Sequence, residues 1–144
     1  MLHYCLDTDV CIRIIRNRPF IGGDLEARLN EHADALATST VVMTELLHGA
    51  AVSANPLKER DNAVRLLARM TVLDFDAEAA EHAADIKADL QKKGRMIGGN
   101  DILIAGHARS RGLTMVTGNL REFERVGGLR VEDWPAGPMV RPGL

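Results

Sequence analysis

Three carboxylates and one amide stand where a folded chain could bring them together: Asp7, Glu45, Asp101 and Asn119. Asp7 ends the apolar stretch 2–7, and Asn119 ends the apolar stretch 113–119. Both stretches have the length and composition of strands, and ligands of parallel sheets bind beyond the carboxyl ends of the strands. We therefore expect Asp7 and Asn119 to face the same edge of a sheet.

The other two acids belong to predicted helices. Asp101 begins the helix expected over about 101–111, and the residues three, four and seven positions further on are Ile104, Ala105 and Ala108. This row is apolar apart from its first member, so Asp101 lies at the top of the face that packs on the sheet. Glu45 has small and apolar residues three and four positions away in the helix expected over 40–52, which places it on or beside a buried face.

A buried carboxylate needs a partner, because otherwise it protonates or destabilises the fold. No lysine or arginine lies on the same helical faces as Asp101 and Glu45. One divalent cation would offset several of these costs together, and oxygen ligands suit Mg²⁺ or Mn²⁺. Such an ion activates water and stabilises charge on a phosphoryl group during hydrolysis. The group of residues therefore indicates metal-assisted hydrolysis of a phosphate ester.

Each residue also has a structural interpretation. Asp7 could cap the helix that follows it, and Asp101 could be a first-turn acid favoured by the helix dipole. Glu45 could be a solvated helix residue, and Asn119 could simply form a turn. These interpretations account for the residues one at a time but do not explain the group.

The elements that position these residues alternate along the chain. We predict strands at 2–7, 35–39, 71–76, 113–119 and 129–133, and helices at 8–17, 24–33, 40–52, 58–70, 77–94 and 101–111. This alternation is typical of an α/β fold with a parallel sheet and helices on both faces. Neither an internal repeat nor a linker is evident, so we expect one domain over 1–134. The tail 135–144, with three prolines and two glycines, is expected to stay outside the fold.

Composition narrows the class of protein. The chain has 144 residues and a net charge of −2, and its basic residues gather in local groups that could still contact RNA. No apolar run is long enough to span a bilayer and no signal peptide is evident, so we expect a cytoplasmic protein. Cys5 and Cys11 are expected to be core residues and not a disulfide. Nucleotide-binding glycine loops, a G-x-S-x-G elbow and zinc-ligand spacings are absent.

Three blocks of the sequence carry a resemblance. "YCLDTDVCI", "TVVMTELLHGA" and "GRMIGGNDILIAGHARSRGLTMVTGNLREFERVGGLRVEDW" resemble the PIN-domain ribonuclease toxins of the VapC type, in this order and spacing, from about residue 3 to Trp134. The resemblance implies a PIN-like fold and a Mg²⁺-dependent endoribonuclease (with Mn²⁺ as the other candidate ion), the toxin of a type II toxin–antitoxin system. It further implies a homodimer, a cognate antitoxin and a structured RNA substrate, especially tRNA, with the initiator tRNA as the suggested target.

The resemblance also implies roles for residues. Asp7, Glu45 and Asp101 match the family's acidic site, and Asn119 stands at a fourth position that is neutral here. Glu122, three residues further on, is the candidate to supply the missing charge. Basic residues expected to position the RNA backbone around the site are Arg16, Lys92, Lys93 and Arg95.

Two alternatives from other classes stay open at this point. The "DTDV" after the first strand is similar to the start of haloacid dehalogenase phosphohydrolases, in which the first Asp would be a nucleophile, but the lysine and the later acids of that family have no clear match. The second alternative is a non-catalytic binding module whose carboxylates hold a structural ion or a partner's arginines. A phosphoenzyme on Asp7 would favour the first alternative, and lack of toxicity on expression would favour the second.

Overall fold

The computed structural model describes residues 1–17 and 24–134, except the side chains of Asn17 and Asp24. Its strands are β1 Tyr4–Leu6, β2 Leu36–Ser39, β3 Thr71–Leu73, β4 Thr114–Val116 and β5 Val131–Glu132. Its α-helices are α1 Thr8–Asn17, α2 Asp24–Glu31, α3 Thr40–Ala51, α4 Pro56–Leu67, α5 Ala77–Lys92, α6 Gly99–Ser110 and α7 Leu120–Phe123, with a 3₁₀ turn at Ala33–Ala35. The tail predicted at 135–144 lies outside the described residues.

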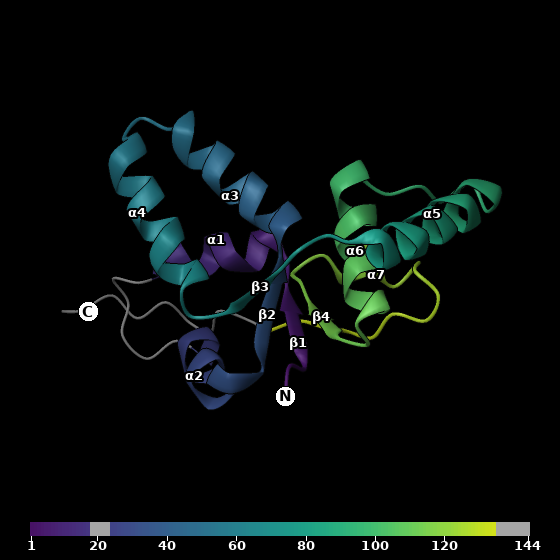
Figure 1. The fold of residues 1–144 in the computed structure, drawn as a ribbon, viewed down its shortest axis with the longest axis horizontal. Coiled ribbons are helices and arrows are strands. Elements are labelled where there is room, and N and C mark those ends of the chain that lie inside the picture. The colour runs from purple at the N-terminus through teal and green to yellow at the C-terminus, as the bar shows by residue number, and fades with distance from the viewer. Residues whose placement is uncertain (18–23, 135–144) are drawn as a thin grey trace.

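The strands form one parallel sheet in the order β3-β2-β1-β4-β5. The chain moves outward from β1 to β3 and then returns to the other side of β1. Because parallel crossovers are right-handed, this reversal puts the helices before β3 and those after it on opposite faces. Figure 1 shows α1, α3 and α4 on one side of the strands and α5, α6 and α7 on the other. The predicted α/β fold, with helices on both faces of a parallel sheet, is confirmed.

The reversal makes β1 and β4 neighbours, with Leu6 of β1 opposite Val116 of β4. The connections leave these two strands toward opposite faces, which opens a crevice beyond their carboxyl ends. Asp7 follows β1 and Thr117 follows β4, so both residues lie at this topological switch point. The fold therefore brings two strand ends together that are 110 residues apart in sequence.

The last two large helices pack closely. A Cβ atom built on Gly106 of α6 would come within 2.6 Å of the backbone nitrogen of Ala83 in α5. Glycine at this position therefore lets the two backbones approach more closely than any side chain would permit. This contact sets how closely α6, the helix that carries Asp101, packs against α5.

The predicted elements differ from the structure mainly at their ends. The strands expected at 71–76 and 113–119 stop three residues early, at Leu73 and Val116, and the short helix α7 was not predicted. Helix α4 begins earlier than predicted because Asn55 caps it, accepting from the Lys58 nitrogen, and Pro56 at the first position needs no hydrogen bond.

Two further expectations concern the described residues. Cys5 and Cys11 are both buried and free, as predicted. Among the described residues, no helix combines the length and the apolar character that a membrane span would require.

Candidate active site

Asp7 is the most deeply buried acid of the site, with 5% of its surface exposed. Its Oδ1 accepts a hydrogen bond from the Thr8 backbone nitrogen at 2.7 Å, and its Oδ2 accepts one from Thr117 Oγ1 at 2.8 Å. The first bond of α1 runs from the Cys11 nitrogen to the Asp7 carbonyl at 3.1 Å, so the helix starts directly after the acid. The same residue thus begins the helix and presents a carboxylate at the strand end.

The pKa of Asp7 is raised from 3.8 to about 7, and burial is the largest cause. The neighbouring carboxylates of Asp9 and Asp101 also raise this pKa, while the hydrogen bonds from Thr117 and Thr8 lower it. Desolvation and like charge therefore outweigh two favourable hydrogen bonds. A carboxylate in this environment gains strongly from a nearby cation.

Asp101 is the third residue of α6 and is half-buried. The predicted apolar row below it is confirmed, since Ile104, Ala105 and Ala108 are almost completely buried. Burial raises the pKa of Asp101, and so do the carboxylates of Glu122, Glu45 and Asp9, in that order. The helix begins at Gly99, two residues earlier than predicted.

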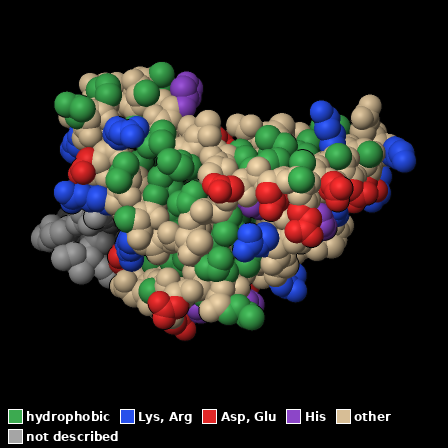
Figure 2. Space-filling model, viewed as in Figure 1, with side chains coloured by type: hydrophobic (Ala, Val, Ile, Leu, Met, Phe, Trp, Pro, Cys, Tyr) green, Lys and Arg blue, Asp and Glu red, His purple; other side chains and the backbone are tan. Residues whose placement is uncertain are grey.

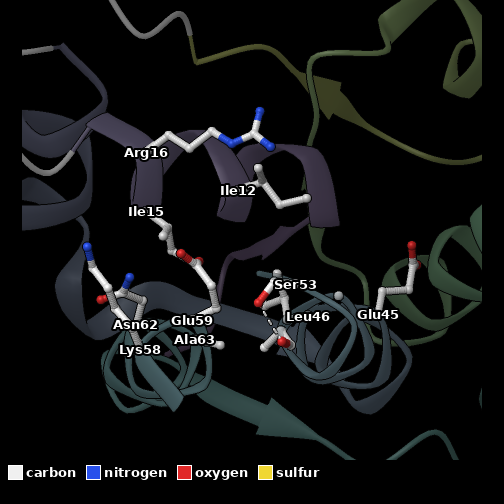
Figure 3. A pocket seen from close by; sticks show the side chains of 12 residues that line it. Ile12, Ile15, Arg16, Glu45, Leu46, Ser53, Lys58, Glu59, Asn62 and Ala63 are labelled. Atoms are coloured by element: carbon white, nitrogen blue, oxygen red, sulfur yellow. Dashed lines mark hydrogen bonds between the residues drawn. The ribbon is translucent and has the colours of Figure 1, made fainter. Parts of the chain in front are cut away.

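Glu45 lies on α3 and is half-buried, as its apolar neighbours indicated. Its Oε1 atom is buried and has no hydrogen-bond partner in the part of the chain that the structure describes. An unpaired buried carboxylate oxygen is costly, which makes it a natural ligand for a cation or a bound water. Glu45 also forms one end of a cavity of about 610 Å³ between α1, α3 and α4, with Lys58 and Asn62 at the other end (Figure 3).

Asn119 and Glu122 act as one unit. The Asn119 side-chain nitrogen donates to Glu122 Oε2 at 2.9 Å, and the Asn119 backbone nitrogen donates to Thr117 Oγ1 at 3.0 Å. Glu122 is also the charged group that raises the pKa of Asp101 most. The structure therefore brings both candidates for the fourth position to the acidic group.

Asp9 also lies at the site, although the sequence predicted no role for it there. It is the second residue of α1, and its carboxylate accepts from the Gly118 backbone nitrogen at 3.1 Å. It raises the pKa of both Asp7 and Asp101 and so stands close to them. The D-x-D spacing after the first strand was the available signal.

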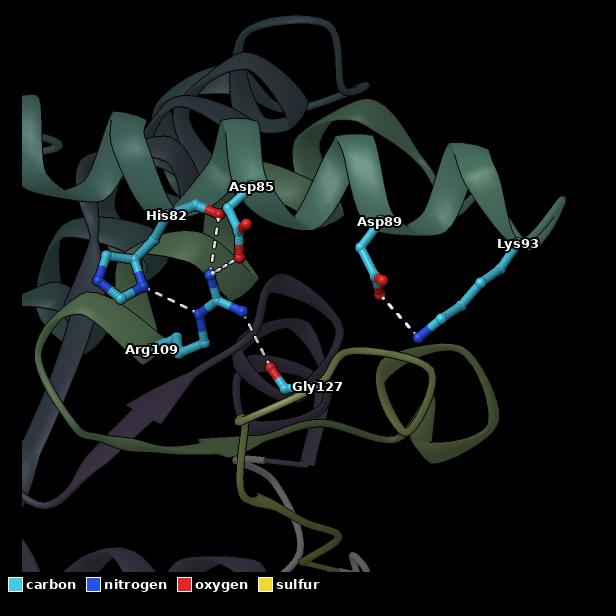
Figure 4. Close-up of polar contacts among 6 residues, drawn as sticks. All are labelled: His82, Asp85, Asp89, Lys93, Arg109 and Gly127. Atoms are coloured by element: carbon cyan, nitrogen blue, oxygen red, sulfur yellow. Dashed lines mark hydrogen bonds and ion pairs between the residues drawn. The ribbon is translucent and has the colours of Figure 1, made fainter.

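The four basic residues expected around the site lie in different parts of the structure. Arg16 lines the same cavity as Glu45. Lys92 and Lys93 belong to the last turn of α5, at the outer end of that layer, and Lys93 pairs with Asp89 at 3.0 Å (Figures 1 and 4). Arg95 follows in the connection from α5 to α6. Only Arg16 therefore has a described contact with the surroundings of the acids.

The histidines near the site in sequence do not join it. His107 is buried, with Nδ1 2.7 Å from Ser39 Oγ, and Ser39 caps α3 by accepting from the Val41 nitrogen. This contact ties α6 to the start of α3, which is a structural role for His107. His48 is exposed on α3.

The donor set at the site consists of oxygen atoms, which fits Mg²⁺ or Mn²⁺ better than zinc. Burial of Asp7, the unpaired Glu45 oxygen and the mutual repulsion of the acids all favour a bound cation. Within residues 1–17 and 24–134, no three His, Cys, Asp or Glu side chains stand close enough to hold an ion directly. Mg²⁺ commonly keeps several waters, so one or two direct carboxylates and water-bridged neighbours suffice.

Comparisons with known proteins agree with this geometry. The PIN domain family matches residues 4–129. The chain is 48% identical to the tRNA(fMet)-specific endonuclease VapC of Shigella flexneri, covering 93% of this chain and 99% of that one, and 46% identical to ribonuclease VapC2 of Haemophilus influenzae over the same shares.

Solved structures give the same result. The DNA-bound VapBC structure from Salmonella typhimurium superposes with a TM-score of 0.89 at 42% identity, covering 94% of this chain and 100% of that one. VapBC2 from Rickettsia felis, bound to a promoter DNA fragment, gives 0.87 at 31% identity, with 93% and 100% covered.

The fold is that of a PIN-domain nuclease. The chain belongs to the PIN-domain family and, within it, to the VapC ribonucleases. It is accordingly an endoribonuclease, and the phosphohydrolase alternative is wrong. PIN-domain ribonucleases generally need a divalent metal ion.

Proposed function

We propose that this chain is a toxin that cleaves tRNA, with the initiator tRNA as its target, using Mg²⁺ at the acidic site. The observation that carries the proposal is the buried Asp7 carboxylate at the β1/β4 switch point, which has further acids around it and no paired cation among the described residues. The Shigella flexneri and Salmonella typhimurium relatives are named tRNA(fMet)-specific endonucleases, which supports the choice of substrate.

Asp7 and Asp101 are the proposed ligands of the ion, either directly or through water, and Glu45 completes the shell or orients the attacking water. When bound, the ion would neutralise the scissile phosphate and lower the pKa of its water. Thr117 and the Thr8 nitrogen hold the Asp7 oxygens in place through their hydrogen bonds. Asn119 positions Glu122 toward Asp101, so this pair is proposed as the fourth member of the site.

A protein partner is the second part of the proposal. The VapBC structures similar to this chain are toxin–antitoxin complexes, which supports a cognate antitoxin as the inhibitor. Large apolar side chains are exposed at the outer end of α3 and on α4, namely Val52, Leu57 and Val64, with exposed fractions of 71%, 85% and 47%. Figure 2 shows hydrophobic side chains grouped over this end of the molecule. Such a patch is typical of a protein contact and supports either the antitoxin or a homodimer.

The proposed nuclease domain extends over 1–134, with 135–144 as its tail and the cytoplasm as its location. Full burial of Trp134, which contacts Tyr4 at a ring distance of 4.8 Å, supports that boundary. It packs against the first strand and so belongs to the same core.

The test is RNA cleavage by the purified, antitoxin-free protein with Mg²⁺, with 5′-end sequencing of the fragments. We expect one dominant cut in initiator tRNA and a loss of activity in Asp7→Asn and Asp101→Asn well beyond the roughly 10–100-fold effect of an outer-shell residue. Asp61→Asn, in an exposed pair with Arg65, is the matched control and should cut normally. If both site variants cut as well as the parent, the acidic-site proposal fails.

A further inference from the structure

Arg13 of α1 borders the segment 117–119 between β4 and α7, which lies next to the acidic site. A Cβ atom on Gly118 would lie 2.7 Å from Arg13 Nη2 and 2.7 Å from Asp9 Oδ2, so the glycine lies between these two side chains. Gly118 directly follows Thr117, the hydrogen-bond donor to Asp7, and precedes Asn119. The guanidinium therefore stands at the edge of the segment 117–119, between β4 and α7.

The usual partner of Arg13 is engaged elsewhere. Asp9 is four residues earlier on the same helix, the ordinary spacing for an ion pair. Its carboxylate instead accepts from the Gly118 nitrogen at 3.1 Å. The described ion pair of Arg13 is with Asp133, at 3.5 Å between Nη2 and Oδ1, with both side chains about one-third exposed (32% and 38%). A pair this long and this exposed contributes little.

The guanidinium has donors that the protein does not use. Nε and Nη2 of Arg13 are buried and make no hydrogen bond with the described residues, and Nη2 has only the 3.5 Å ion pair with Asp133 among them. A charged group with buried, unpaired donors is costly, and a bound anion would offset that cost. The planar fork of an arginine matches the oxygen atoms of a phosphate. Because Nε and Nη2 are buried, the exposed third of the side chain belongs to its other atoms, and a phosphate would reach the guanidinium from that edge.

The charge of Arg13 is not used to neutralise the acids. The pKa values of Asp7 and Asp101 are shifted by burial, by other carboxylates and, for Asp7, by hydrogen bonds. No arginine or lysine of the described residues contributes to the shift of either pKa. A cation beside the site, but not paired with its acids, remains available to an anionic substrate.

We propose that Arg13 binds a phosphate of the RNA strand next to the scissile bond and so positions the substrate over Asp7 and Asp101. This inference rests on the proposed ribonuclease function and adds a substrate-binding residue to it. In the sequence, Arg13 is only one of several basic residues in local groups, and no role is predicted for it. Its place across Gly118 from Asp9 is visible only in the folded chain.

Binding of an uncut RNA tests the proposal. Fluorescently labelled initiator tRNA is titrated by fluorescence anisotropy against protein carrying Asp7→Asn, at several salt concentrations. Adding Arg13→Met should weaken binding roughly tenfold and lower the log–log salt slope by about 0.7–0.9. Arg13→Lys keeps the charge but not the fork, so its affinity should fall between the two.

Two controls separate phosphate binding from a structural role. Asp133→Asn removes the ion-pair partner of Arg13 and should leave RNA binding unchanged or tighter, because it removes a competing anion. Arg65→Met removes an exposed arginine of α4, paired with Asp61, and should change neither the affinity nor the salt slope. Thermal unfolding of every variant shows whether each one folds.

Three results would overturn the proposal. The first is an Arg13→Met protein with unchanged affinity and salt slope. The second is an equal loss of RNA binding and of melting temperature in Arg13→Met and Asp133→Asn, which would make Arg13 a structural partner. The third is weaker Mn²⁺ binding in Arg13→Met with unchanged RNA affinity. If the parent protein cuts no RNA at all, the proposed function fails, whereas a cutting parent with an unaffected Arg13→Met contradicts only this inference.

Discussion

Thr117 donates a hydrogen bond from its hydroxyl to the buried carboxylate of Asp7, with 2.8 Å between the two oxygens. The two residues follow adjacent parallel strands, β4 and β1, so this single bond joins the two strand ends at the switch point of the sheet. It also lowers the pKa of Asp7 against the stronger effect of burial. Thr117 therefore both orients the central acid and helps to keep it ionised.

Replacement of Thr117 tests this relationship. Thr117→Val keeps the shape but removes the donor, so the pKa of Asp7 should rise and RNA cleavage should fall by roughly 10–100-fold, as for other outer-shell partners. The pH at which cleavage reaches half its maximum should move upward. Thr117→Ser keeps the hydroxyl and should retain most of the activity. A Val variant with the parent's pH–rate profile would show that the bond has no such effect.

The raised pKa of Asp7 predicts a pH dependence of stability in the metal-free protein. In the folded chain the group keeps its proton up to about pH 7, whereas in the unfolded chain it loses it near pH 3.8. The folded state thus binds more protons in this interval, and the free energy of unfolding should fall as pH rises from about 4 to about 7. The change attributable to Asp7 is at most about 4 kcal/mol.

The measurement is urea unfolding with EDTA at several pH values, for the parent and for Asp7→Asn. Asp101 has a raised pKa and acts in the same direction, whereas the lowered pKa of His107 acts in the opposite direction. The difference between the two proteins removes these contributions and isolates Asp7. Equal slopes of stability against pH in the parent and the variant would contradict the raised pKa. Added Mg²⁺ should stabilise the parent at pH 7 more than the variant.

Arg109 should be important for stability and not for catalysis. Its guanidinium donates to His82 Nδ1 at 2.9 Å, to the Gly127 carbonyl at 3.0 Å and to Asp85 at 2.7 Å, which ties α5, α6 and the 127 loop together (Figure 4). Because its side chain is only 17% exposed, Arg109→Met should cost about 2–4 kcal/mol of unfolding free energy.

Chemical denaturation of Arg109→Met beside Arg65→Met checks this expectation. The Arg65 side chain is 63% exposed, so its removal should cost well under 1 kcal/mol. Equal costs for the two variants would mean that the Arg109 contacts do not contribute as described.

The close approach of α5 and α6 predicts opposite effects of the same substitution at two glycines. Gly106→Ala would place a methyl group 2.6 Å from the Ala83 nitrogen, which forces the backbones apart and should cost about 1–3 kcal/mol. Gly49→Ala on α3 meets nothing within 4 Å and should stabilise its helix by about 0.5–1 kcal/mol. Melting temperatures of the two variants give the answer, and a stable Gly106→Ala protein would disprove the tight packing.

The sequence by itself determined the order of the elements and the class of the site. Alternating apolar stretches predicted the parallel sheet, and the apolar row below Asp101 predicted its inward place, because these patterns depend on local periodicity. Asp7 and Asn119 were expected at the strand ends for the same reason. The three blocks resembling VapC toxins supplied the expected family, which the comparisons confirm.

Only the tertiary structure decided which side chains meet. Asp9 joins the acids because the backbone nitrogen of Gly118, more than a hundred residues away, donates a hydrogen bond to its carboxylate. Lys92 and Lys93 come shortly before Asp101 in the sequence, yet they lie at the outer end of α5. Periodicity reports which face of an element is buried but not what lies opposite that face. Contacts such as Thr117 to Asp7, or Arg13 across Gly118, depend on strand order and crossover handedness, which local sequence does not encode.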